Sequence, residues 1–149
     1  MTSRDLGSSH KDRIAEITKH LLSLEDDAME SWRQGDPWGW TEISSDDVTY
    51  FDPTLEAPIV GLEALKTYYA NIEGKIKYEG SEYLQPQVQV YGDTAVLSYR
   101  YVSTNIGENG TPAHHTRWNC TEVYVKIHNK WKIVHTHWSY IGGREPMEG

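Results

Sequence analysis

Asp52 is the residue whose type and position are best suited to chemistry. It ends the alternating run Val48–Asp52, and Pro53 stops that run from continuing as a strand. A lone carboxylate that faces an apolar, aromatic cavity has its pKa raised by desolvation, which suits a general base near neutral pH. The alternative is a structural role, in which Asp52 closes the turn before Pro53 or pairs with a neighbouring cation.

Arg100 is the second candidate, because a planar guanidinium group can bind a carboxylate through two parallel hydrogen bonds. If its strand points it into a cavity, Arg100 would bind an acidic ligand or form a buried pair with Asp52. If the strand points it outward, it is an exposed surface arginine. Arg117 is a weaker candidate, since it lies near the end of its strand.

Two groups of histidines, His114-His115 and His135-Thr136-His137, raise the question of a metal site. Alternation along a strand puts His135 and His137 on one face, as two ligands of one metal require. No acidic ligand follows them, since the next residues are Trp138-Ser139-Tyr140-Ile141. We therefore predict no metal. The chain contains no dinucleotide or phosphate motif either, so we predict no cofactor.

These residues are carried by helices that come first and long strands that come second. Apolar residues at steps of three and four predict a helix over residues 11–33 and another that begins at Leu62 and is ended by Gly74. Alternation then predicts strands over 77–90, 94–106, 114–127 and 131–141. This order indicates an α+β fold, with the helices packed on one face of a curved sheet.

The length of 149 residues suits a single domain over residues 11–141, with a disordered leader at 1–10 and a tail at 142–149. The formal net charge of −8 argues against nucleic acid or a membrane as partner. Because the first residues lack the apolar run of a secretory signal, we expect a cytoplasmic protein. The acidic run Glu25-Asp26-Asp27, with Glu30, is interpreted as the solvated face of the first helix.

Three segments carry a family resemblance: Arg33-Gln34-Gly35-Asp36, Phe51-Asp52-Pro53 with Gly61 and Tyr68-Tyr69-Ala70, and Asn129–His135 with Ser139. The first resembles the helix-ending Gly-Asp of the nuclear-transport-factor-2-like superfamily. The second resembles the pattern of ketosteroid isomerases, and the third resembles the terminal strand of SnoaL-like proteins. Both of these groups belong to that superfamily.

The C-terminal half is also similar to the association domain of calcium/calmodulin-dependent protein kinase II. The similarity runs almost without gaps over Pro86–Trp131, and His135, His137 and Ser139 match beyond it. No kinase sequence is present, so this resemblance implies a free-standing homologue.

The resemblance implies a cone-shaped, curved antiparallel sheet packed on N-terminal helices around a central cavity, with dimers formed through the sheet. We take Asp52 to face the cavity, as its counterpart in ketosteroid isomerases does. Aligning the chain with those isomerases and applying strand alternation then predicts that these residues point inward: Val48, Tyr50, Ser98, Arg100, Val102, Arg117, Asn119, Thr121, Val123, Val134, Thr136 and Trp138. The opposite face then holds Tyr99, Tyr101, Trp118, Glu122, Tyr124, Trp131, His135 and His137. A single β-bulge would exchange these two sets downstream of it.

The resemblance also implies a site, with Asp52 as the catalytic base. The residues expected to bind a ligand are Trp40, Tyr50, Tyr68, Tyr69, Arg100, Asn119, Thr121 and Trp138. Ketosteroid isomerases add an oxyanion hole made of a Tyr and a protonated Asp. Those two positions fall on Ala28 and Thr121 here, which argues against isomerase activity.

Two functions therefore stay open. The first is a small-molecule-binding cavity protein for a carboxylate or an apolar ring; whether it is also a cofactor-independent isomerase, dehydratase or hydrolase is left undecided. The second is a homo-oligomeric assembly module, a dimer or larger ring whose pocket is regulatory or vestigial.

Overall fold

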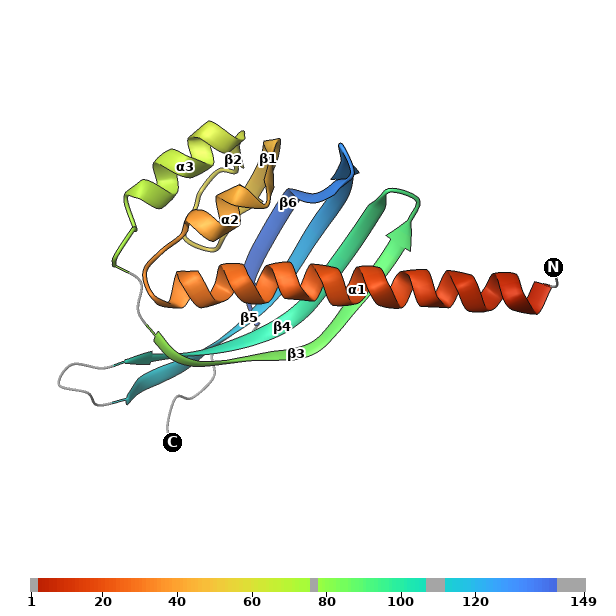
Figure 1. The fold of residues 1–149 in the computed structure, drawn as a ribbon. Coiled ribbons are helices and arrows are strands. Elements are labelled where there is room, and N and C mark those ends of the chain that lie inside the picture. Colours follow the sequence, from red (N-terminus) through yellow and green to blue (C-terminus); the bar gives the residue numbers. More distant parts are fainter. Residues whose placement is uncertain (1–2, 76–77, 107–111, 142–149) are drawn as a thin grey trace.

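The computed structural model describes residues 3–75, 78–106 and 112–141, whose helices and strands form two layers (Figure 1). In chain order the elements are α1 (Ser3–Arg33), α2 (Trp38–Glu42), β1 (Ser44–Phe51), β2 (Ile59–Val60), α3 (Leu62–Ala70), β3 (Tyr78–Tyr91), β4 (Thr94–Ile106), β5 (Pro112–Ile127) and β6 (Lys130–Tyr140). The helices pack on one side of a curled sheet, which confirms the predicted α+β class.

Within the described residues the sheet has the strand order β2-β1-β6-β5-β4-β3. The long strands pair as antiparallel neighbours, as predicted. β1 and β6 pair in parallel, so the expectation of a purely antiparallel sheet is wrong at this one junction. Hairpins between consecutive strands can be predicted from the sequence, whereas β1 and β6 are brought together by the whole intervening chain.

Helix α1 confirms the predicted amphipathic helix and is longer than expected. Its apolar side buries Ile17, Leu21 and Ala28. The helix begins at Ser3, so residues 3–10, which were predicted as a disordered leader, form its first turns. This end of α1 extends past the sheet in Figure 1. The predicted tail at 142–149 lies outside the described residues.

The inner face of β4 and β5 is the opposite of the one predicted. The two strands pair without a register shift from Thr94 to Asn105, so side chains alternate strictly between the two faces. The buried inner set is Ala95, Leu97, Tyr99, Tyr101, Ser103, Cys120, Glu122 and Tyr124. The predicted inward residues lie on the outer face instead: Ser98, Arg100, Val102, Arg117, Asn119, Thr121 and Val123.

A β-bulge in β6 shows why one alternation pattern could not describe all the strands. The register between β5 and β6 shifts by one residue at Val134. Trp131 and Ile133 are buried before the bulge, and Thr136 is buried after it, on the same face as Trp138. The inward orientation of Thr136 and Trp138 is as predicted, while that of Val134 is wrong. A one-residue slip moves every later side chain to the other face.

Candidate binding cavity

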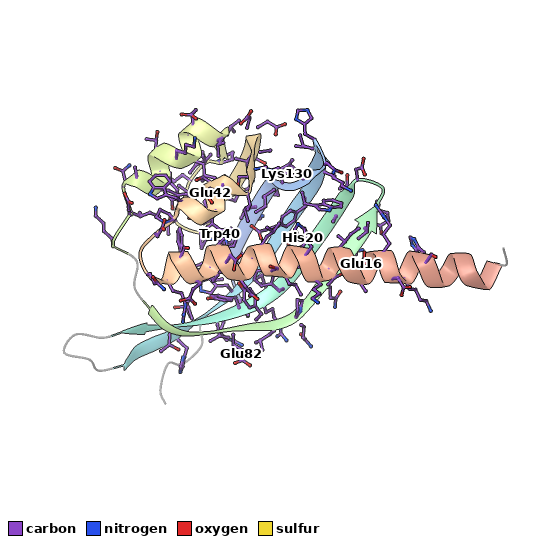
Figure 2. All side chains as sticks on the ribbon, viewed as in Figure 1. Glu16, His20, Trp40, Glu42, Glu82 and Lys130 are labelled. Atoms are coloured by element: carbon purple, nitrogen blue, oxygen red, sulfur yellow. The ribbon has the colours of Figure 1, made fainter. Side chains whose placement is uncertain are left out.

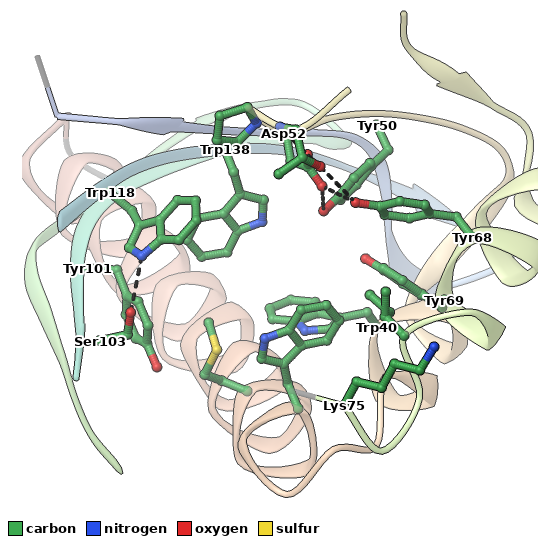
Figure 3. Close-up of a pocket in the computed structure, with 15 residues that line it drawn as sticks. Trp40, Tyr50, Asp52, Tyr68, Tyr69, Lys75, Tyr101, Ser103, Trp118 and Trp138 are labelled. Atoms are coloured by element: carbon green, nitrogen blue, oxygen red, sulfur yellow. Dashed lines mark hydrogen bonds between the residues drawn. The ribbon is translucent and has the colours of Figure 1, made fainter. Parts of the chain in front are cut away.

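A cavity of about 590 Å³ lies between the helices and the sheet (Figure 3). Among the described residues, eight of the fifteen that line it carry aromatic rings. These rings come from almost every element: Trp32 of α1, Trp40 of α2, Tyr50 of β1, Tyr68 and Tyr69 of α3, Tyr101 of β4, Trp118 of β5 and Trp138 of β6. A lining of this kind suits an organic ligand with an apolar or flat surface.

The Asp52 carboxylate is the polar centre of this lining, and four donors from the described residues hold it. The hydroxyls of Tyr50 and Tyr68 donate to Oδ2 over 2.9 and 2.6 Å. The backbone N–H and the hydroxyl of Thr54 donate to Oδ1 over 2.8 and 2.6 Å. A carboxylate offers about four lone-pair positions, so these bonds occupy them. Asp52 thus closes the turn after β1 and also ties β1 to α3.

The phenols around Asp52 stay protonated at neutral pH. Burial, followed by the hydrogen bond to Asp52, raises the pKa of Tyr68 to about 12. Burial also raises the pKa of Tyr50 and of Tyr69, with smaller effects from their charged and phenolic neighbours. Tyr50 and Tyr68 each donate their only hydroxyl proton to Asp52. Their oxygen atoms therefore keep lone pairs that can accept a hydrogen bond from a ligand.

Tryptophan and tyrosine rings from the sheet form the wall opposite α3 (Figure 3). The rings of Trp118 and Trp138 pack edge to face, with centroids 5.7 Å apart, and Tyr101 packs on Trp138 at 6.0 Å. The Trp118 indole N–H donates to Ser103 Oγ over 3.2 Å. These contacts fix the orientation of the rings before any ligand arrives.

The structure brings together six of the residues expected at the site and separates three others. Those that line the cavity are Asp52, Trp40, Tyr50, Tyr68, Tyr69 and Trp138. Arg100, Asn119 and Thr121 are exposed on the outer face of the sheet, so their predicted inward orientation is wrong. Arg100 donates to the side chain of Gln85 there, and it neither pairs with Asp52 nor reaches the cavity.

Three of the aromatic lining residues were not anticipated at the site. Tyr101 and Trp118 were predicted on the outer face, and Trp32 was not among the residues expected to bind a ligand. A signal for the first two exists in the sequence, because one face of β4 carries Leu97, Tyr99 and Tyr101 while the other carries Arg100. Burial of the larger apolar surface favours the first set inside.

Two glutamates, Glu25 of α1 and Glu122 of β5, are fully buried but do not line the cavity. The hydroxyls of Tyr99 and Tyr124 donate to the Glu25 carboxylate, the first over 2.8 Å. The Thr136 hydroxyl donates to Glu122 over 3.0 Å. Both residues were predicted on exposed faces, and those expectations are wrong. A glutamate can be buried where tertiary contacts bring hydrogen-bond donors to its carboxylate. Hydrophobic periodicity along the sequence does not reveal such contacts.

Burial raises the pKa of both carboxyl groups. For Glu122 the negative charge of Glu25 raises it further, well above its usual range. For Glu25, hydrogen bonds with Glu122 and the two tyrosines lower the pKa and partly offset the effect of burial. The raised pKa of Glu122 favours its protonated form, because two buried charges this close would repel each other.

No group of three or more His, Cys, Asp or Glu side chains that could hold a metal ion occurs within the described ranges. His135 and His137 lie on the outer side of the sheet, where both pack on Phe51. The His135 ring nitrogen Nδ1 lies 2.7 Å from the Thr49 hydroxyl. In the part of the chain that the structure describes, no helix has the length and apolar character needed to cross a membrane.

Comparison with known proteins supports the resemblance drawn from the sequence. A model of the calcium/calmodulin dependent protein kinase II association domain family matches residues 17–142. The calcium/calmodulin-dependent protein kinase type II alpha chain of Drosophila melanogaster is 31% identical over 133 residues, which are 87% of this chain and 24% of the kinase. The chain therefore spans about a quarter of the length of this curated relative.

Two solved structures are similar in both sequence and fold. One is a Parabacteroides distasonis protein with the provisional description ketosteroid isomerase. It is 39% identical and has a TM-score of 0.69, and the match covers 81% of this chain and 85% of that one. The other is the calcium/calmodulin-dependent protein kinase II hub of S. rosetta, 28% identical over 83% of this chain and 95% of that one, with a TM-score of 0.66. The nuclear-transport-factor-2-like fold is thereby confirmed. With its family match extending over residues 17–142, the chain belongs to the calcium/calmodulin-dependent protein kinase II association domain family.

Proposed function

We propose that the chain binds one small organic molecule in its aromatic cavity. The observation that supports this most strongly is the convergence of eight aromatic rings and one carboxylate, among the described residues, on a space of about 590 Å³. Ligand sites are commonly about 300–1,000 Å³ and combine an apolar lining with a few placed polar groups. The ring-to-ring packing and the bonds to Asp52 hold this lining in position without a ligand.

Binding is favoured over the isomerase chemistry expected from the resemblance. A general base needs a free lone pair that points at the proton it removes. Each oxygen of Asp52 already accepts two hydrogen bonds. The two oxyanion-hole positions give no help, since Ala28 has no hydroxyl and Thr121 is exposed on the outer face. Proton transfer by Asp52 would first require one of its present donors to turn away.

A neutral fluorescent dye, N-phenyl-1-naphthylamine, tests the cavity directly. We expect the wild-type protein to bind the dye with an increase in fluorescence. Ser103→Phe should abolish binding, because Ser103 is buried at the cavity and a phenyl ring there would fill part of it. Thr104→Phe is the matched control on the same strand, since Thr104 points to the other face. Failure of the wild-type protein to bind the dye, or equal binding by both variants, would refute the proposal.

We also propose self-association through the outer face of the sheet. The family match and the relative described as a hub support it. On this face Phe51 packs on His137, with ring centroids 5.1 Å apart, and Thr121 is the cross-strand neighbour of His137. Within the described residues, the helices pack on the opposite side of the sheet. An uncovered face of this kind is suited to a second copy of the chain.

Sedimentation velocity tests this second proposal. We expect His137→Glu to shift the wild-type oligomer toward monomer, because His137 is exposed at the centre of the proposed contact and the change adds a negative charge to it. Lys19→Glu, on the exposed side of α1, makes a charge change on the other layer and should leave the oligomer unchanged. A wild-type monomer, or a His137→Glu variant that sediments like wild type, would contradict the proposed interface.

A further inference from the structure

The charges at the cavity are the first indication of what it binds. Among the described lining residues, Asp52 and Lys75 carry formal charges. Asp52 forms no ion pair with any described residue. Lys75 is exposed, and its ammonium group points away from the centre of the cavity in Figure 3. The field inside the cavity therefore favours a positive ligand.

Hydrogen-bond direction gives a second, independent indication. The hydroxyl protons of Tyr50, Tyr68 and Thr54 all point to Asp52. At this end the cavity therefore presents oxygen lone pairs, and those oxygens accept hydrogen bonds rather than donate them. A carboxylate ligand would meet these lone pairs and the charge of Asp52. An ammonium group would donate to them and be attracted by the same charge.

The arrangement of the rings gives a third indication. Trp138, Trp118 and Tyr101 lie on one side of the cavity, Trp40 lies below them, and Tyr68 with Tyr69 lies opposite (Figure 3). The face of an aromatic ring attracts a cation, most strongly for tryptophan, and cages of such rings recognise quaternary ammonium groups. The volume of about 590 Å³ exceeds what an ammonium group alone would fill, so the ligand also has an apolar body.

On the basis of the proposed binding function, we infer that the cavity takes an organic cation: a protonated or quaternary amine that carries an apolar body. The amine lies against the phenol oxygens around Asp52, and the apolar body lies against the tryptophans of β5 and β6. This differs from the carboxylate expected from the sequence, because that expectation depended on an inward Arg100, which is exposed on the outer face.

Three probes that share one body and differ in charge test the inference. They are 2-phenylethylammonium, 2-phenylethanol and phenylacetate, each used at neutral pH to displace N-phenyl-1-naphthylamine. We expect the cation to displace the dye at a concentration about tenfold lower than the alcohol, and phenylacetate to be the weakest. Equal or better displacement by the alcohol or by phenylacetate would overturn the inference while leaving the proposed binding function intact. Absence of dye binding by the wild-type protein would refute both the inference and the proposed binding function.

The variant Asp52→Asn tests the source of the preference. It removes the charge and keeps the size of the side chain, so we expect the cation and the alcohol to displace the dye at about the same concentration, each measured against the variant's own affinity for the dye. Asp46→Asn is the matched control, because Asp46 is an exposed aspartate on β1, the strand that Asp52 directly follows. Retention of the preference in Asp52→Asn, or its loss in Asp46→Asn, would contradict the assignment of Asp52 as the charge that selects the ligand.

Discussion

The variant Glu122→Gln should change how the stability of the protein depends on pH. Glu122 is fully buried, and burial with the charge of Glu25 raises its pKa well above 4.5. The folded protein thus keeps a proton that the unfolded chain releases. The amide that Glu122→Gln introduces would have nearly the same shape and could donate to Glu25 and accept from Thr136, but it has no proton to release.

The sign and size of the effect follow from this difference in bound protons. Where the folded state holds one proton more than the unfolded state, the free energy of unfolding falls by about 1.4 kcal/mol for each pH unit of increase. The contribution of Glu122 is complete below its unfolded pKa near 4.5 and is lost as pH rises toward its folded pKa. Above pH 5, the free energy of unfolding of wild type should therefore fall more steeply with pH than that of Glu122→Gln, by at most about 1.4 kcal/mol per pH unit.

Urea unfolding followed by tryptophan fluorescence measures this difference. Wild type and variant are compared at several pH values between about 5 and 7, at one protein concentration because self-association shifts apparent stability. The matched control is Glu42→Gln, since Glu42 is an exposed glutamate of α2 (Figure 2). It should keep the wild-type slope. If Glu122→Gln also keeps that slope, Glu122 does not hold the extra proton.

Two further predictions concern the backbone and the thiol. Gly35 has a φ of +90°, and a Cβ there would lie 3.0 Å from Gly74 Cα, whereas Gly92, with a φ of +62°, has open space beside it. Gly35→Ala should therefore lower the free energy of unfolding by about 2 kcal/mol or more and Gly92→Ala by about 1 kcal/mol, both measured in urea; equal losses would contradict the close approach. Cys120 is buried, and burial raises the pKa of its thiol. A thiol-specific reagent at neutral pH should label it only after unfolding, and rapid labelling of the folded protein would contradict its burial.

Local patterns in the sequence were sufficient for the elements and for one side of the cavity. The spacing of Ile17, Leu21, Leu24 and Ala28 in steps of four, three and four predicts α1, because these steps follow the period of the helix itself. The resemblance around Asp52 placed this residue with Tyr68, and their side chains do meet, at 2.6 Å.

Which side chains of the long strands point to the cavity could be learned only from the tertiary structure. Alternation shows which residues of one strand share a face of the sheet. Which of these sets points inward in the next strand depends on how the strands pair and on where bulges lie. The one-residue shift at Val134 is visible only in the pairing of β5 with β6. Arg100 was expected inside and Trp118 outside because the facing of β4 and β5 was carried over from the isomerase alignment, and the structure reverses both.

By itself the sequence determined the α+β class, the order of the elements and the association domain resemblance, because these depend on periodicity and motifs that are local in the chain. Only the tertiary structure decided that the cavity is lined by Tyr101 and Trp118 and that Asp52 is its one inward-facing charge among the described lining residues. It also decided that Glu25 and Glu122 are buried, which raises the pKa of both. These features depend on contacts between residues far apart in sequence, and a charged side chain is accommodated inside only where such contacts supply its partners.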